Sequence, residues 1–245
     1  MQITVLEKTP AKATFLISKA GENGIAFVNA LRRAIISQLP AFAMEDITFY
    51  ENNSALYNEY IANRLGLVPL TWEEGIADDA KISLTLSMDG PCTVYSRDIK
   101  STDDTIKVYS QNIPVAVLGL DQRLRFEAVA IKGTSKAHAK FQSAHAAFAN
   151  LAKMTAAKKI DDELVIHEYP ATSEKPEEFA KKHMELCDYN LEYVRIGDSI
   201  YKIELEPDEY LFTVESYNNI EATKQFWRGV SLLKAKLTEL AAEIK

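Results

Sequence analysis

The sequence predicts an α+β protein in which short strands are combined with a few amphipathic helices. Apolar and polar residues alternate in the first strand-like segments, and the same pattern returns near the end of the chain. Residues 24–39 and 226–244 instead carry apolar residues at every third or fourth position, which is typical of helices with one buried face. With 245 residues, 47% of them hydrophobic, the chain is long enough to bury a sizeable core.

The first elements are a predicted hairpin and a helix. The alternating apolar residues of the hairpin are Ile3, Val5, Ala13, Phe15 and Ile17. Thr9 and Pro10 supply the turn between the two strands. From Gly24 the period changes to that of a helix of about four turns, and Pro40 ends it.

The middle of the chain reads mostly as strands. A strand runs from Pro40 through Phe49 and is followed by a polar turn and a short helix at 58–65, with Gly66 as its C-cap. Further strands are predicted at 81–88, 93–96, 115–118, 124–131 and 138–142.

A change of composition follows. Residues 145–159 are helical in composition, and residues 155–185 become rich in Lys, Glu, Asp and Pro, which indicates a small polar insertion. A second helix is predicted within it. The helix of the insertion and the strands after it are expected at 176–187, 191–196, 199–205 and 210–216.

The last segment has the clearest periodicity. We call its apolar residues the apolar stripe: Phe226, Val230, Leu233, Leu237, Leu240 and Ile244. Their 4-3-4-3-4 spacing is typical of a helix packed on another element. Asn218 and Glu221 suggest a capping box at its start. The stripe must be covered either by the chain's own sheet or by another subunit, because each exposed side chain would forfeit roughly 1.5–3 kcal/mol.

Composition excludes several classes of protein. A formal net charge of −7 argues against a chain that binds nucleic acid by itself. Two cysteines are too few for a disulfide framework and are consistent with a reducing compartment. The first residues lack the pattern of a signal peptide, and no apolar run reaches the length of a membrane span. We therefore expect a soluble, cytoplasmic protein that does not bind membranes.

Catalytic motifs are also missing. The four histidines lack metal-ligand spacing, and there is no glycine-rich phosphate loop or nucleophile elbow. Acidic pairs occur at 78–79, 103–104 and 161–162 in polar, turn-like stretches. A metal-dependent hydrolase that uses these pairs is one alternative, but solvated turns explain them without chemistry. We expect no catalytic residues, no metal and no cofactor.

Two motifs carry a family resemblance. Residues 24–40, with Asn29-Ala30-Leu31-Arg32-Arg33 at their centre, and residues 53–70, ending in Arg64-Leu65-Gly66-Leu67-Val68-Pro69-Leu70, occur in the order found in one family. They resemble the motifs shared by bacterial RNA polymerase alpha, the archaeal D-type polymerase subunit and the eukaryotic third-largest subunit. Weaker similarity at 138–142 and 212–216 favours the archaeal type. Asn58 and Asn63 depart from the Asp and His that are usual in the family.

The resemblance implies a domain organisation. A discontinuous alpha-like dimerisation domain would comprise residues 1–42 and 206–245, with a mostly-β domain inserted at 43–144. A small α/β insertion would occupy 145–205, where many archaeal relatives carry an iron–sulfur domain. A cluster needs about three or four cysteine thiolates. Only Cys187 lies in this region, so we expect no cluster.

It also implies a non-catalytic role in transcription, as the assembly platform of a DNA-directed RNA polymerase. The partners would be a smaller subunit L-like protein, the large catalytic subunits, and small zinc-binding subunits resembling N and P, with DNA contacted only through the holoenzyme. The implied dimer interface comprises Phe27, Leu31, Ile35, Phe226, Val230, Leu233, Leu237 and Leu240. The residues expected to dock on large subunits are Arg32, Arg33, Glu59 and Arg64. A homodimeric adaptor outside any polymerase remains a second alternative.

Overall fold

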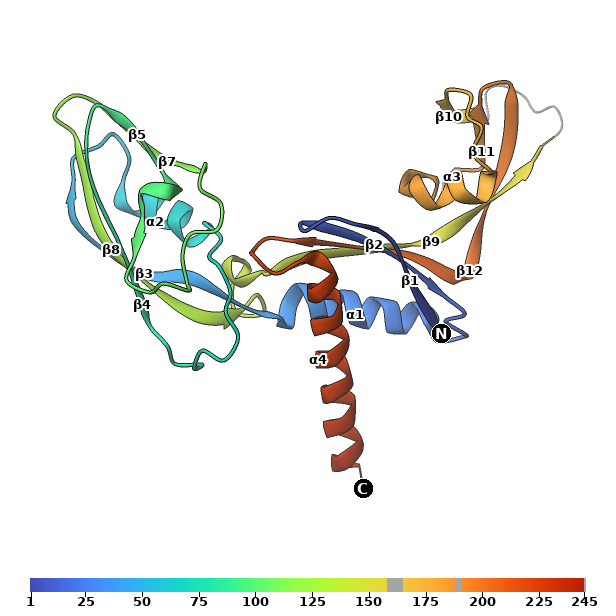
Figure 1. Ribbon diagram of the computed structural model, residues 1–245, viewed down its shortest axis with the longest axis horizontal. Helices are drawn as coiled ribbons and strands as arrows, with labels where there is room; N and C mark the ends of the chain where they lie inside the picture. The colour runs from blue at the N-terminus through green and yellow to red at the C-terminus, as the bar shows by residue number, and fades with distance from the viewer. Residues whose placement is uncertain (158–164, 188–190, 245) are drawn as a thin grey trace. The chain divides into compact units, whose positions relative to one another are not determined.

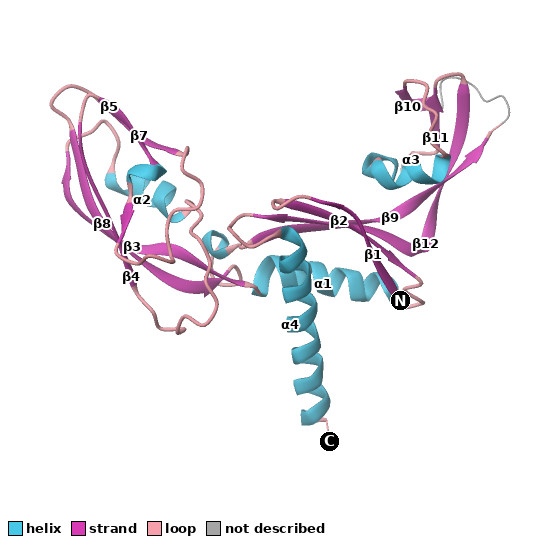
Figure 2. Ribbon diagram, viewed as in Figure 1, coloured by secondary structure: helices cyan, strands magenta, loops and turns pink. Residues whose placement is uncertain are grey.

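The computed structural model describes residues 1–157, 165–187 and 191–244. These residues form two compact units, each made from two separate stretches of the chain. Unit 1 contains residues 1–32 and 146–214, and unit 2 contains residues 33–145 and 215–245. Helices and sheets are mixed in sequence, which confirms the α+β class (Figure 2). The three expected domains do not coincide with these units and stay a prediction.

Unit 1 is organised around a six-stranded sheet with β12 at its centre (Figure 1). The strands follow the order β1-β2-β12-β11-β10, and β9 also pairs with β12. Their bounds are β1 Gln2–Lys8, β2 Lys12–Ser18, β9 Ala144–Ala156, β10 Val165–Tyr169, β11 Tyr193–Ile196 and β12 Ser199–Ser216. Because β12 is 18 residues long, one strand replaces the two expected at 199–205 and 210–216.

The connection between β10 and β11 carries the helices of the expected insertion. These two strands run parallel, whereas β11 and β12 are antiparallel. A parallel pair requires a crossover, and α3 (Pro176–Lys182) with the 3₁₀ helix η4 (Met184–Cys187) provides it. Phe179 and Leu186 bury this segment in a cluster that Leu16 of β2 also joins.

The helix expected at 145–159 is wrong, because residues 144–156 form strand β9. Alanine favours helices in isolation, but pairing with β12 overrides that preference. Ala144, Ala146, Ala152 and Met154 are buried on even-numbered positions, in the period of two of a strand, and Leu151 is buried in addition. Residues 158 and 159 lie outside the described part of the chain.

Unit 2 contains a four-stranded antiparallel sheet in the order β3-β8-β4-β6 and a two-stranded sheet of β5 and β7. Their bounds are β3 Pro40–Asn52, β4 Ile82–Asp89, β5 Cys92–Tyr95, β6 Lys100–Ser101, β7 Pro114–Leu118 and β8 Arg123–Thr134. The strands predicted at 81–88, 93–96, 115–118 and 124–131 are confirmed within a few residues.

The apolar core of unit 2 combines residues of its four-stranded sheet with residues of helix α2 (Asn58–Gly66). Phe126 and Leu84 from the strands pack with Ile61 and Leu65 of α2 in one buried cluster. Helix α2 forms where it was predicted, although its C-cap is Leu67 in a right-handed conformation rather than Gly66. The strand expected at 138–142 is wrong, since η2 (Ala139–Phe141) is a 3₁₀ turn in which His138 Nδ1 accepts from the Lys140 amide.

Both amphipathic helices form. Helix α1 (Gly24–Gln38) ends before Pro40, and the division between the units falls within it, after Arg32. Helix α4 (Ala222–Glu243) belongs to unit 2. The expected capping box is absent from α4, because its N-cap Glu221 makes no side-chain cap hydrogen bond. Asn218 instead accepts from the Ile220 amide with its Oδ1 atom.

Candidate subunit interface

The apolar stripe of α4 is covered at one end only. Phe226 is fully buried, and Val230 and Leu233 are half-buried. Further along, Leu237 is 55% exposed and Leu240 is 51% exposed. In Figure 1 the second half of α4 extends away from the other elements of unit 2. The helix therefore presents an apolar face that its own unit does not cover.

The first turn of α4 is fastened by a buried amide. Gln225 is fully buried, and its Nε2 atom donates to Asn218 Oδ1 at 3.1 Å and to the Ser143 carbonyl at 3.4 Å. The Tyr217 amide donates to the same Ser143 carbonyl at 3.0 Å. A buried amide keeps its place only where it finds such partners. These bonds fix the position from which α4 starts.

A second connection joins the turn before α4 to Trp72. The Trp72 amide donates to Asn219 Oδ1 at 2.5 Å, and Asn219 Nδ2 donates to the Trp72 carbonyl at 3.0 Å. The guanidinium carbon of Arg228, on α4, lies 4.8 Å from the centre of the Trp72 ring, in reach of a cation–π interaction. Trp72 and Asn219, which are 147 positions apart in sequence, thus together fix the position of the first turn of α4.

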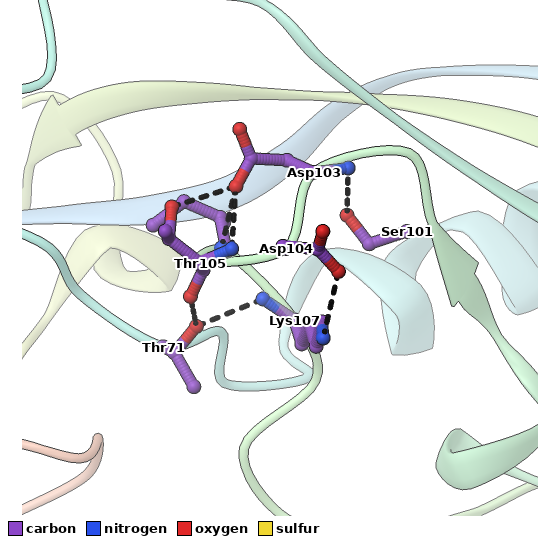
Figure 3. A network of polar contacts seen from close by, with 7 residues as sticks. Thr71, Ser101, Asp103, Asp104, Thr105 and Lys107 are labelled. Atoms are coloured by element: carbon purple, nitrogen blue, oxygen red, sulfur yellow. Dashed lines mark hydrogen bonds and ion pairs between the residues drawn. The ribbon is translucent and has the colours of Figure 1, made fainter.

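The segment that carries Trp72 is itself held by a polar network (Figure 3). Thr71 Oγ1 donates to the Thr105 carbonyl at 2.6 Å and accepts from the Lys107 amide at 2.8 Å. Asp103 Oδ1 accepts from both the amide and the hydroxyl of Thr105. These bonds lower the pKa of Asp103, the largest cause being the Thr105 hydroxyl.

The expected interface residues of α1 have little free surface. Leu31 and Ile35 are fully buried within the chain, and Phe27 is half-buried. Phe27 and Leu31 belong to unit 1, whereas Ile35 belongs to unit 2 with the apolar stripe. Among the expected interface residues, the surface available to a partner thus lies mainly on the second half of α4.

The paired arginines of α1 have different surroundings. Arg32 donates through Nε and Nη2 to Asn29 Oδ1, at 3.2 and 3.0 Å, which directs its guanidinium along the helix. Arg33 is exposed, and within the described part of the chain its side chain makes no hydrogen bond or ion pair. Arg33 therefore has its full set of donors available for a carboxylate.

Of the two expected docking residues on α2, one is exposed and one is partly engaged. Glu59 is exposed to solvent. Arg64 donates to the Pro114 carbonyl at the start of β7 and to the Tyr60 hydroxyl at 3.4 Å, so it stabilises its own unit. The Oδ1 atom of Asn58 accepts from Asn52 Nδ2 at 2.7 Å, a bond that needs no charge at position 58.

Several exposed apolar residues around α2 were not predicted. These residues, from α2 and the strand and turn next to it, are Tyr57, Tyr60, Leu67, Val117 and Leu120, all more than half exposed. All residues of β7 are apolar, so the sequence gives no signal that Val117 is exposed, and it offers none for Tyr57 and Tyr60 either. Groups of exposed apolar residues often mark contacts with other proteins.

Two of the three acidic pairs of the hydrolase alternative, at 78–79 and 103–104, lie in turns or bends, where carboxylates of both pairs have partners in the same unit. Asp78 contacts Lys132 Nζ at 2.6 Å, and Asp104 contacts Lys107 Nζ at 3.3 Å. The pair at 161–162 lies outside the described residues. Within residues 1–157, 165–187 and 191–244, no cluster of three or more His, Cys, Asp or Glu could hold a metal ion. No helix in these ranges has the length and apolarity of a membrane span.

Comparison with known proteins identifies the family. The sequence profile of the RNA polymerase Rpb3/RpoA insert domain matches residues 47–153. DNA-directed RNA polymerase subunit Rpo3 of Thermococcus kodakarensis is 34% identical over 257 residues, covering 100% of this chain and 98% of the relative. Subunit Rpo3 of Pyrococcus horikoshii is 31% identical with the same coverage. That of Methanocaldococcus jannaschii is 44% identical over 52% of this chain and 65% of its own length. The chain therefore belongs to the Rpo3 family of archaeal DNA-directed RNA polymerase subunits, also called the D type.

Proposed function

We propose that the chain is a non-catalytic subunit that pairs with a smaller subunit L-like protein and so forms the platform on which the polymerase assembles. The observation that carries the proposal is the exposed half of the apolar stripe, Leu237, Leu240 and Ile244. Exposure of this face to water is unfavourable by roughly 25 cal/mol per Å² of apolar surface. A helix of matching periodicity in the partner would cover it.

The docking of large subunits forms a second part of the proposal. Arg33 and Glu59 are exposed, and they offer opposite charges to a partner. Exposed apolar surface comes from Tyr57 and Tyr60, close to Glu59 in sequence, and from Leu67, Val117 and Leu120, and tyrosines are enriched in such contacts. Small zinc-binding subunits resembling N and P would join the same assembly, and DNA would be reached only through the holoenzyme.

An affinity pulldown of the tagged chain from its native lysate tests the proposal. We expect mass spectrometry to find two very large polymerase subunits and one small alpha-like subunit. Recovery of the chain alone would favour a homodimeric adaptor, because a second copy of α4 could cover the same stripe.

A matched pair of variants tests the interface itself. The double variant Leu237→Glu, Leu240→Glu should lose the small partner, because two buried carboxylates without partners are costly. Lys234→Glu changes the charge on an exposed position of the same helix outside the apolar stripe and should retain the partner. If both variants retain the small subunit equally, the stripe is not the interface.

A further inference from the structure

A broad groove lies between α4 and the segment that follows α2 in unit 2. Its volume is about 880 Å³, enough for several side chains. Leu39, Ile220 and Leu232 supply apolar wall, and Trp72 and Trp227 supply indole rings. The chain has two tryptophans, and both line this groove.

Arg228 lines the groove as a cation without a counter-ion. Its guanidinium packs on the Trp72 ring and donates through Nη1 to the neutral Gln225 Oε1 at 3.0 Å. No carboxylate lies within 4.0 Å of it in the described part of the chain. Burial lowers the pKa of Arg228, and the more distant Glu74 opposes this only in part. A partly buried charge of this kind is stabilised by a carboxylate that bonds to it directly.

The Trp72 ring supports Arg228. Trp72 is 93% buried, as its exposed fraction is 7%, and its Nε1 atom is buried without a hydrogen-bond partner among the described residues. A ligand in the groove therefore reaches the guanidinium and not this N–H. Lys224 contributes a further positive charge to the groove lining. Arg228 and Lys224 therefore favour a ligand that carries acceptor oxygens.

Two carboxylates in the groove lining decide the kind of ligand. Glu73 and Glu74 are exposed, and both line the groove together with Arg228. They would repel the continuous phosphates of a nucleic acid, as would the net charge of −7. A single carboxylate that reaches Arg228 past the rim meets less of this repulsion, because water screens the exposed glutamates.

We infer that this groove binds an acidic segment of another polymerase subunit, with one carboxylate on Arg228 and an apolar neighbour against Trp227. The inference rests on the proposed function, since it takes the occupant to be a partner in the same assembly. It adds a contact distinct from the apolar stripe, on the face of α4 that Arg228 occupies.

Intrinsic fluorescence of the full chain tests this without a label, because both indoles lie in the groove. The probes are a blocked tetrapeptide in which two leucines flank aspartate and glutamate, and its isostere with asparagine and glutamine. The acidic peptide should shift the emission and bind about tenfold more tightly than the isostere. Equal affinities, or no change in emission with either peptide, would overturn the inference.

Variants assign the effect to Arg228. Arg228→Gln should remove the preference for the acidic peptide, and Arg228→Lys should keep part of it, because lysine retains the charge without the planar fork. Lys224→Gln, at an exposed position, should weaken binding of the acidic peptide about threefold. This variant tests the inference if the Arg228 variants fail to fold. Lys234→Gln, on α4 outside the groove, should change nothing. An equal effect of Lys234→Gln would show that only general charge attraction is measured.

The acidic wall supplies a test of opposite sign. Glu74→Gln should tighten binding of the acidic peptide, because it removes a negative charge near Arg228 that repels the carboxylates of the peptide. Weaker binding would indicate that the groove prefers a basic segment and would overturn the inference. The native pulldown separates this result from the proposed function: a chain that recovers polymerase subunits but binds neither peptide refutes the groove alone.

Discussion

The side chain of Asn219 bonds to the backbone of Trp72 as a neighbouring strand would, accepting from its amide and donating to its carbonyl. Both bonds fix the orientation of the amide group, since an exchange of its oxygen and nitrogen would break both. The tryptophan backbone is thereby satisfied at a place where no strand pairs with it. One polar side chain thus connects the start of α4 to the loop after α2.

Replacing Asn219 should destabilise the protein. Asn219→Ala leaves the Trp72 amide and carbonyl without their partners, and we expect a loss of about 1–3 kcal/mol in the free energy of unfolding. Urea denaturation followed by circular dichroism measures this difference. Asn63→Ala, at an exposed position of α2, is the control and should stay within about 0.5 kcal/mol of the parent chain. Equal stability of the two variants would contradict the role of Asn219.

The two halves of the apolar stripe should respond differently to truncation. Phe226→Ala creates a cavity in the chain's own core and should cost about 3–5 kcal/mol of its stability. Leu240→Ala removes an exposed side chain, so the dilute chain should lose no more than about 0.5 kcal/mol, while binding of the small partner weakens. Thermal unfolding of the chain, with and without that partner, gives both quantities. A large loss from Leu240→Ala in the dilute chain would mean that the chain itself covers this residue.

Gly133 marks a close approach between β8 and η2. A Cβ atom at this position would lie 2.8 Å from two atoms of the buried Phe141 ring. Gly133→Ala should therefore destabilise the chain by about 1–3 kcal/mol through overpacking. At Gly66 the nearest atoms are 3.6 Å away, so Gly66→Ala should be tolerated within about 1 kcal/mol. Chemical denaturation of both variants compares them directly, and a tolerated alanine at position 133 would refute the close packing.

Tyr169 should make the stability of unit 1 dependent on pH in alkaline solution. Burial, together with its hydrogen bond to Glu185 Oε1 at 3.0 Å, raises its pKa from 10.0 to about 12. Below pH 10 Tyr169 keeps its proton in both the folded and the unfolded chain, so its full contribution to the free energy of unfolding is present. Between pH 10 and about 12 the unfolded chain loses the proton first, so stability falls as pH rises.

The denaturation midpoint, measured from pH 8 upward, tests this dependence. The fall should be shallower for Tyr169→Phe, which has no proton to lose. Glu185→Gln should also reduce it, because the neutral amide removes the repulsion between the carboxylate and a phenolate. Parallel curves for the parent chain and Tyr169→Phe would show that other tyrosines cause the effect.

Much of the fold was accessible from local patterns. Helices α1 and α4 were predicted because Leu31 and Phe226 each belong to a clear helical period. Helix α2 was predicted from the polar turn before it and from Gly66 after it. The segment 144–156 was not, because alanine is small enough to suit a helix or a strand, and only pairing with β12 decides between them. Asn218 does not cap α4, because the helix begins only at Ala222; its Oδ1 atom accepts instead from the Ile220 amide and from Gln225.

The candidate interface was predictable only in part. Periodicity identified the apolar stripe, but it does not show that Phe226 is buried while Leu240 is exposed. That difference depends on how far along α4 the other elements of unit 2 pack against it. The cluster of Trp72, Asn219 and Arg228 has no local pattern at all. Its members come together only when residues from distant parts of the chain have folded.

The two-part construction of unit 2 has a consequence during synthesis on the ribosome. Its second stretch, residues 215–245, is synthesised after the whole of its first stretch, so Trp72 must wait for Asn219. At about 5–20 residues per second, the 147 intervening positions require roughly 7–30 s. Throughout that interval the nascent unit exposes the surface that α4 later covers, and transiently exposed surface of this kind is open to non-native contacts.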